Sequence, residues 1–211
     1  MDNENNRYDY SEDAETYDLS VKEYGSYGHD VLFGMSFEYV KPGQNVLDIG
    51  IGTGLGSYNF ALSGLKVFGL DSSQKMLNIC KTKKFTESLA LYDIIKDVIP
   101  HDDNSFDNIV CSGVLHFVGD LKDFFKEVKR VAKPGATFSF TFAPHENRES
   151  FLRENTDWGV PIYRHSLPYI TELLNENDFD IVKEQRLLLK GADKINYNML
   201  FSAVIAKKRT V

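Results

Sequence analysis

The stretch VLDIGIGTG, residues 46–54, decides the fold, because an apolar run leads directly into a turn with glycine at every second position. This pattern is typical of a buried strand that turns into a helix. Alternating glycines remove the Cβ atoms from one side of the turn, so that backbone can approach a ligand. The helix that follows directs unpaired N–H groups at the same point, which suits an anionic or carboxylate-bearing ligand. A tight turn without a ligand is the alternative, and Asp48 and Asp71 at two strand ends argue against it.

Strands and helices alternate on both sides of this turn. Apolar residues at helical spacing predict helices near 31–39, 55–62, 73–80 and 121–132, and one more after Ser166. Short apolar runs predict strands near 46–49, 67–70, 89–92, 106–111, 137–142, 181–189 and 199–206. Such alternation predicts a mostly parallel sheet, covered on both faces, with a ligand site beyond the carboxyl ends of its strands. Residues 143–165 show no clear periodicity, which predicts an inserted loop or short-helix segment rather than sheet.

Composition and charge indicate one ordinary domain, residues 29–211, preceded by an extension, residues 1–28. The net charge is −7, and the first 18 residues hold seven acids against one base, which leaves the remainder nearly neutral. The sequence has no long basic stripe, which disfavours nucleic-acid binding. It has no apolar run of about 20 residues and no basic-then-apolar leader, so we expect no membrane span and a cytoplasmic location. Cys80 and Cys111 lie far apart in apolar runs, which predicts two buried reduced thiols.

The glycine turn and Asp71 together predict a nucleoside cofactor. Asp71 follows Gly54 by 17 residues and ends the second strand, where a carboxylate accepts hydrogen bonds from ribose hydroxyls. A dinucleotide fingerprint needs a third glycine that would fall on Leu55 or Ser57, so the pattern disfavours NAD and FAD. No Gly-Lys-Ser/Thr follows, which disfavours a phosphate-binding loop of the Walker type. A nicotinamide oxidoreductase is retained as a weaker alternative.

Four motifs in order resemble those of the class I S-adenosylmethionine-dependent methyltransferases. They are VLDIGIGTG (46–54), VFGLDSSQKML (67–77), SFDNIVCSGVLHF (105–117) and FFKEVKRVAKPGATFSFTF (124–142). The resemblance covers nearly the whole chain and implies an α/β, Rossmann-like, doubly wound and mostly parallel seven-stranded sheet. In that arrangement the last strand is antiparallel and helices cover both faces.

The resemblance also implies roles for the cofactor-side residues. Gly50, Gly52 and Gly54 would line the methionine portion of S-adenosylmethionine, and Asp48 would orient its ammonium group. Asp71 would bind both ribose hydroxyls. The other residues expected around the cofactor are Leu55, Ser72, Met76 against adenine, Asp93 or Ile94 at its amino edge, and Ser112 at the methionine portion.

The N-terminal extension resembles the opening segment of a narrower group within the family. Ala14-Glu15-Thr16-Tyr17-Asp18 matches part of that segment, although Tyr8-Asp9 lies two residues too far upstream and the tryptophan is absent. Five of the 11 tyrosines lie in the first 30 residues, which a free acidic tail would not require. We expect residues 1–12 to fray and the rest to form a lid, with Tyr17 reaching the cofactor carboxylate.

On the acceptor side, His116 follows the fourth predicted strand and is the candidate general base, with a wall of the cofactor pocket as an equal alternative. Candidate acceptor-binding residues are Tyr27, Trp158, Tyr163, Arg164 and His165. Ordinary packing is the alternative for Trp158, and Ser166 is expected to cap a helix. The five histidines show neither HxH nor HExxH spacing, so no metal is expected.

The sequence therefore predicts an enzyme that transfers a methyl group from S-adenosylmethionine to a small-molecule acceptor. A protein or RNA methyltransferase and a non-catalytic nucleoside-binding module of the same fold remain open alternatives. We expect a monomer or a homodimer, with no nucleic-acid or membrane partner.

Overall fold

A computed structural model of the chain describes residues 14–156, 159–190 and 198–210. The central sheet that they form contains, in spatial order, β3 (Thr86–Leu91), β2 (Lys66–Asp71), β1 (Asn45–Ile49), β4 (Phe106–Cys111), β5 (Ala132–Phe142), β10 (Asn198–Lys208) and β9 (Phe179–Lys190). The first five strands are parallel, and β10 runs antiparallel to both β5 and β9. The predicted seven-stranded, mostly parallel sheet with an antiparallel last strand is confirmed.

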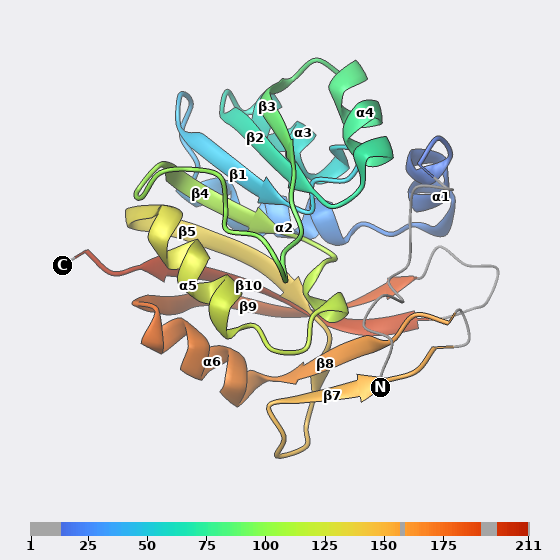
Figure 1. Ribbon diagram of the computed structural model, residues 1–211, viewed down its shortest axis with the longest axis vertical. Helices are drawn as coiled ribbons and strands as arrows, with labels where there is room; N and C mark the ends of the chain where they lie inside the picture. The colour runs from blue at the N-terminus through green and yellow to red at the C-terminus, as the bar shows by residue number, and fades with distance from the viewer. Residues whose placement is uncertain (1–13, 157–158, 191–197, 211) are drawn as a thin grey trace.

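Helices cover both faces of this sheet (Figure 1). One face carries α2 (Gly28–Ser36), α3 (Leu55–Leu62) and α4 (Gln74–Thr82), and the other carries α5 (Lys122–Val131) and α6 (Leu167–Glu176). The core of the first face includes Leu32, Phe60 and Leu77, and that of the second includes Phe125 and Leu173. A short helix, α1 (Tyr17–Tyr24), precedes α2, and the 3₁₀ turns η1 (Phe37–Tyr39) and η2 (Leu115–Phe117) follow α2 and β4.

Burial on both faces explains why β1 is an unbroken apolar run. Val46 packs into the core under α2 and α3, whereas Leu47 and Ile49 pack into the opposite core. Each of these side chains is at most 1% exposed. Burying such a side chain contributes roughly 1.5–3 kcal/mol, so the strand holds the glycine turn at a fixed place on the sheet edge.

Serine caps begin two of the helices. Ser73 Oγ accepts a hydrogen bond from the Met76 amide at 3.3 Å at the start of α4, and Ser166 Oγ accepts one from the Tyr169 amide at 3.4 Å at the start of α6. Both bonds satisfy amides that have no partner inside the helix. The expected capping role of Ser166 is thus confirmed.

The prediction for residues 143–165 is wrong, because this segment contributes to a second, three-stranded sheet. Its strands are β6 (Pro144–His145), β8 (Ile162–Ser166) and β7 (Phe151–Glu154), with β8 in the middle. β7 and β8 are antiparallel, and Leu152 lies opposite Arg164. Strands of two to five residues are too short for alternation to emerge from the sequence, and pairing between them supplies the order that local pattern does not.

Two further expectations concern single residues and the membrane. Cys80 and Cys111 are buried free thiols, as predicted. None of the described helices combines the length and the apolar composition that a membrane span requires. The expected frayed segment, residues 1–12, lies outside the described residues.

Candidate cofactor site

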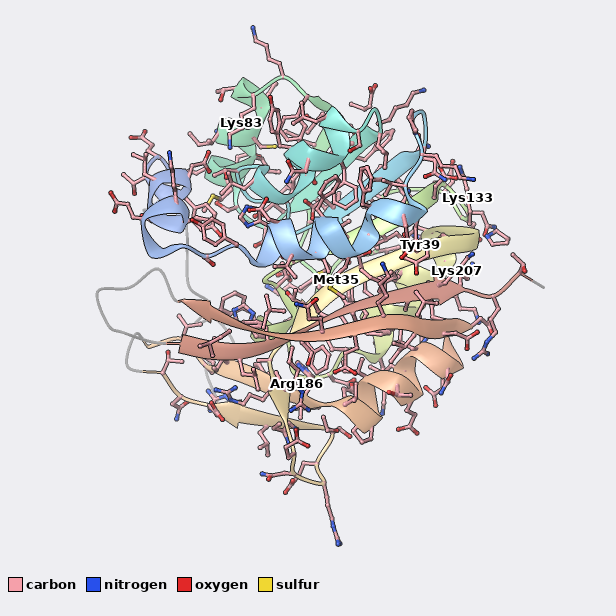
Figure 2. The ribbon with its side chains drawn as sticks, turned by 180° about the vertical axis from the view of Figure 1, so that it is seen from behind. Met35, Tyr39, Lys83, Lys133, Arg186 and Lys207 are labelled. Atoms are coloured by element: carbon pink, nitrogen blue, oxygen red, sulfur yellow. The ribbon has the colours of Figure 1, made fainter. Side chains whose placement is uncertain are left out.

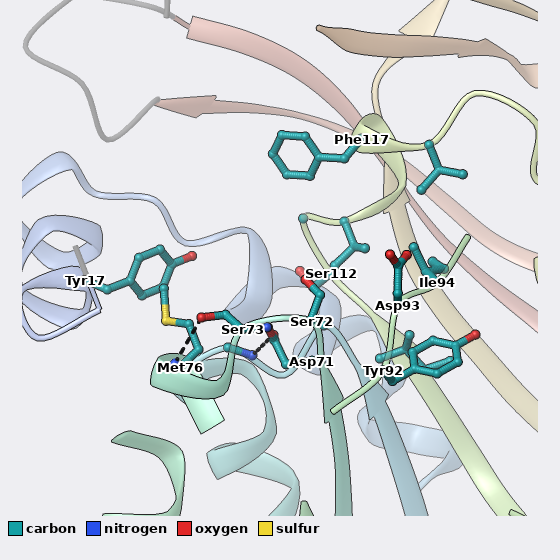
Figure 3. A pocket seen from close by; sticks show the side chains of 16 residues that line it. Tyr17, Asp71, Ser72, Ser73, Met76, Tyr92, Asp93, Ile94, Ser112 and Phe117 are labelled. Carbon is teal, nitrogen blue, oxygen red and sulfur yellow. Dashed lines mark hydrogen bonds between the residues drawn. The ribbon is translucent and has the colours of Figure 1, made fainter. Parts of the chain in front are cut away.

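A cavity of about 400 Å³ opens at the carboxyl edge of the central sheet. Its walls come from the carboxyl ends of β1 and β2, from the segments that follow β1, β2, β3 and β4, and from residues of α1, α4 and η2 (Figure 3). This volume falls within the roughly 300–1,000 Å³ typical of small-molecule pockets. The cavity is lined by Tyr17, Ile49, Gly50, Gly52, Asp71, Ser72, Ser73, Met76, Tyr92, Asp93, Ile94, Ser112, Gly113, Val114, Phe117 and Val118.

The three glycines of the turn differ in their surroundings. A Cβ at Gly50 would lie 2.1 Å from Val114 Cγ2, so this position brings the turn close to the segment after β4. At Gly52 the Cβ direction meets nothing within 4 Å and faces open space. A Cβ at Gly54 would lie 2.6 Å from Phe85 Cζ, because the turn packs there against neighbouring side chains. Gly50 and Gly52 line the cavity, whereas Gly54 does not.

Asp71 is fixed to this turn by its carboxylate. Its Oδ2 accepts a hydrogen bond from the Gly52 amide at 2.7 Å, and its Oδ1 accepts one from the Ser73 amide at 2.8 Å. Burial raises the pKa of Asp71, and the backbone donors oppose that rise. A carboxylate has about four acceptor positions, so both oxygens retain capacity for hydroxyl donors of a ligand.

Asp48 lies beneath the turn rather than in the cavity wall. It is 4% exposed and accepts a hydrogen bond from Ser57 Oγ. Burial raises its pKa to about 7. Asp48, Gly54 and Leu55 are thus the three predicted cofactor residues that do not line the cavity.

The described part of the N-terminal extension lies over the cavity. Tyr17 projects from α1 toward Met76 in Figure 3 and lines the cavity. The next residue, Asp18, accepts a hydrogen bond from Thr53 Oγ1 at 2.5 Å and pairs with Lys83 Nζ at 2.5 Å. Burial, followed by the charges of Asp71 and Asp18, raises the pKa of Tyr17. Consecutive residues of α1 therefore contact the cavity and the body of the domain.

The segment after β4 forms the opposite wall. Ser112 and Gly113 line the cavity, and the Gly113 amide donates a hydrogen bond to Thr141 Oγ1 of β5 at 2.8 Å. Thr141 is fully buried, so its hydroxyl is a fixed acceptor for this loop. Beyond Gly113 the lining turns apolar, with Val114, Phe117 and Val118.

His116 is placed behind this wall. Its ring lies 3.9 Å from the Phe117 ring and 5.4 Å from the Phe201 ring, measured between centroids, and the residue is 7% exposed. It does not line the cavity. Burial, assisted by the nearby His165 and Arg164, lowers the pKa of His116 to about 3. At neutral pH this imidazole is uncharged and weakly basic.

The predicted acceptor-binding residues that the structure describes do not line the cavity; they are Tyr27, Tyr163, Arg164 and His165. His165 is fully buried, and its Nε2 lies 2.9 Å from the Val118 carbonyl oxygen and 3.1 Å from that of Gly119. Because carbonyls only accept hydrogen bonds, Nε2 must carry the proton. His165 thus supports the cavity wall at Val118.

Tyr27, Tyr163 and Arg164 have other surroundings. Arg164 Nε donates to both carboxylate oxygens of Glu154, each at 2.8 Å, within the β7–β8 pair. The Tyr163 ring packs edge-on against Phe151, with centroids 6.0 Å apart. Tyr27 is 56% exposed. Trp158 lies outside the described residues.

The lining includes residues for which the sequence predicted no ligand contact. They are Ile49, Ser73, Tyr92, Gly113, Val114, Phe117 and Val118. Each lies within two residues of a predicted site residue, and that proximity in the chain is the only signal the sequence offers. No group of three potential metal ligands is found in the part of the chain that the structure describes.

This geometry is that of a Rossmann-like domain with a cavity at the carboxyl edge of its sheet, and comparisons with known proteins show which proteins the chain is similar to. The Methyltransferase domain family matches residues 47–140. A demethylmenaquinone methyltransferase of Tropheryma whipplei is 30% identical over 131 residues, 62% of this chain and 51% of that protein. A ubiquinone biosynthesis O-methyltransferase of Hahella chejuensis is 31% identical over 114 residues, 53% and 48% of the two chains. The chain thus spans about half the length of these curated relatives.

Solved structures agree on the fold. An S-adenosylmethionine-dependent methyltransferase from Methanosarcina mazei superposes with a TM-score of 0.70 at 20% identity, covering 84% of this chain and 98% of that one. The chain is thus similar to S-adenosylmethionine-dependent methyltransferases, in sequence over residues 47–140 and in fold over most of its length. The name of the Methanosarcina mazei protein gives S-adenosylmethionine as the cofactor of that protein.

Proposed function

We propose that the protein transfers the methyl group of S-adenosylmethionine to a small-molecule acceptor. The observation that carries this proposal is the Asp71 carboxylate, fixed to Gly52 in the wall of a cavity at the ends of four parallel strands. The open Cβ direction at Gly52 leaves room for a ligand against backbone, so the site fits the cofactor. When bound, S-adenosylmethionine supplies an electrophilic methyl group on its sulfonium.

The chain's own residues bind and orient in this proposal. Asp71 accepts hydrogen bonds from the ribose hydroxyls, and Met76 and Ile94 flank the adenine, with Asp93 near its amino edge. Gly50, Gly52 and Ser112 surround the methionine portion, and the lid, α1 with Tyr17, covers it. Holding two reactants at near-attack distance can supply roughly 7–11 kcal/mol of the barrier, so orientation is the main catalytic contribution.

The acceptor is proposed to enter beside Val114, Phe117 and Val118. These apolar residues follow Ser112 and Gly113 in the cavity lining, and Figure 3 shows Phe117 at the end of the cavity away from Tyr92. An apolar or planar acceptor suits such a wall. Two relatives are named as a demethylmenaquinone methyltransferase and a ubiquinone biosynthesis O-methyltransferase, and the quinone ring in those names is planar, which supports the same choice.

His116 is proposed to support this wall rather than to act as a base. The support for this choice is its ring against Phe117 and its pKa of about 3. A general base is most effective when its pKa lies near the working pH. His116→Asn should then leave the shape of the pH–rate profile unchanged, and the loss of a limb near pH 6–7 would restore the base assignment.

A transfer assay with tritium in the methyl group tests the proposal. The protein is incubated with labelled cofactor and panels of phenols and quinols, amines, thiols, bulk protein and RNA, with Asp71→Ala as a control that should bind the cofactor more weakly and, at limiting cofactor, transfer less label. Label in a small-molecule fraction is the expected result. Label only in protein or RNA would make the enzyme a macromolecular methyltransferase, and cofactor binding without transfer to any acceptor would favour a nucleoside-binding module.

A further inference from the structure

The lid is a short helix that needs external support. α1 has eight residues, and isolated helices shorter than about 12–15 residues are marginal in water. Leu19, an apolar residue of its first turn, is 62% exposed and adds little burial. Its position over the cavity therefore depends on the contacts that individual side chains make with the rest of the domain.

Asp18 makes two such contacts with two different elements. Its Oδ1 accepts a hydrogen bond from Thr53, which stands between Gly52 and Gly54 in the glycine turn, and its Oδ2 pairs with Lys83 at the end of α4. Thr53 is 1% exposed, so its hydroxyl is fixed in place. Figure 2 shows Lys83 on the side of the molecule where α1 lies.

We propose that Asp18 is a positioning residue, which holds Tyr17 over the cofactor through a latch formed by Asp18, Thr53 and Lys83. Tyr17 and Asp18 are neighbours at the start of α1, so fixing the Asp18 carboxylate fixes the direction in which Tyr17 projects. The latch also joins the lid to the same turn that contacts the ligand through Gly52. This inference rests on the proposed function, because the ligand under the lid is the proposed cofactor.

The latch is partly exposed, which sets the size of its effect. The side chains of Lys83 and Asp18 are 26% and 37% exposed, so solvent weakens their attraction. The bond from the buried Thr53 hydroxyl is less screened. Removing the Asp18 charge should weaken cofactor binding about 3- to 10-fold, between the effect of an exposed ion pair and that of a hydrogen bond to a charged group.

The test measures S-adenosylhomocysteine binding by calorimetry for the wild type, Asp18→Asn, Lys83→Met and the double variant. Asp123→Asn is the matched control, because it removes an exposed ion pair with Lys126 on α5. We expect each single latch variant to bind 3- to 10-fold more weakly, the double variant no more weakly than the singles, and the control to bind normally. Thermal midpoints should all remain near that of the wild type, which separates positioning from folding.

Hydrogen exchange of residues 14–24 without ligand gives a second measurement. Faster exchange in Asp18→Asn and Lys83→Met than in Asp123→Asn is the expected result. Wild-type affinity in both latch variants, or a loss that only follows a lower thermal midpoint, would overturn the latch. If the wild type itself binds no S-adenosylhomocysteine, the proposed function fails. The latch is then tested by hydrogen exchange alone, and exchange rates in the latch variants that equal those of the wild type would overturn it.

Discussion

Asp71 Oδ2 accepts the Gly52 amide hydrogen at 2.7 Å, so the carboxylate that ends β2 is tied to the turn that follows β1. The bond links two cavity-lining residues, one at the end of β2 and one in the turn after the neighbouring strand β1. It also ties the carboxylate that is proposed to bind the ribose hydroxyls to the backbone that is proposed to surround the methionine portion. Changing either residue should therefore affect ligand binding more than folding.

Asp71→Ala should weaken S-adenosylhomocysteine binding about 10- to 100-fold. The reason is the loss of hydrogen bonds to a charged acceptor, each worth roughly 1.5–3 kcal/mol. Calorimetry on a variant whose circular dichroism matches that of the wild type measures the effect. Unchanged affinity in such a folded variant would remove the ribose assignment.

Gly52→Ala and Gly54→Ala form a matched pair, since both positions have positive φ, +55° and +89°. Alanine there costs about 1–2 kcal/mol of backbone strain in each case. At Gly52 the added methyl group enters the open cavity, so affinity should fall with only this modest loss of stability. At Gly54 it would meet Phe85 and Cys80, so the thermal midpoint should fall further. Thermal melts measure the loss of stability and calorimetry measures the loss of cofactor affinity in both variants. A larger loss of stability in Gly52→Ala than in Gly54→Ala would contradict the assignment of these glycines.

Thr141→Val should disturb the cofactor wall from within the sheet. Valine has nearly the shape of threonine but leaves the Gly113 amide without its acceptor. The KM for S-adenosylmethionine should rise about 3- to 10-fold, in keeping with one lost hydrogen bond of roughly 0.5–1.5 kcal/mol. Thr141→Ser keeps a hydroxyl and should restore most of the loss. If serine and valine behave alike, the bond to Gly113 is irrelevant to the site.

His116 should make the fold sensitive to acid. Its pKa is about 3 when folded and near 6.5 when unfolded, so below pH 6.5 the unfolded chain takes up a proton that the folded chain does not. Its contribution to stability is thus present above pH 6.5 and is lost as the pH falls toward 3. Between pH 7 and pH 5 the wild type should lose about 2 kcal/mol more unfolding free energy than His116→Phe.

Denaturant titrations at the two pH values measure this difference. Asp48 has a raised pKa and acts in the opposite direction, but it is present in both proteins and cancels from the comparison. Equal losses in the two proteins would mean that His116 is not held in its neutral form.

The predicted site residues that line the cavity are those fixed by local pattern. Gly50, Gly52 and Asp71 stand at the ends of strongly apolar runs, and parallel strands bring those ends to one edge. Leu47 and Ile49 were recognisable as core because a buried strand is apolar on both faces. For such residues, position in the chain and position in space are linked by the geometry of the sheet alone.

The acceptor side depends on pairings that local pattern does not encode. Arg164 pairs with Glu154, ten residues earlier, only because β7 and β8 form an antiparallel pair. Phe117 rather than His116 faces the cavity because the 3₁₀ turn η2 directs neighbouring side chains differently. Asp48 lies under the turn because Ser57 supplies its hydrogen bond from the next helix.

The central claim is that this cavity binds the methyl donor and its product, and calorimetric titration of the wild-type protein with S-adenosylhomocysteine tests it most directly. The account predicts saturable binding of one molecule per chain with a dissociation constant in the micromolar range, about −8 kcal/mol, and no saturable heat with NAD. A folded wild-type protein that binds no S-adenosylhomocysteine at millimolar concentration, or binds NAD equally well, would contradict it.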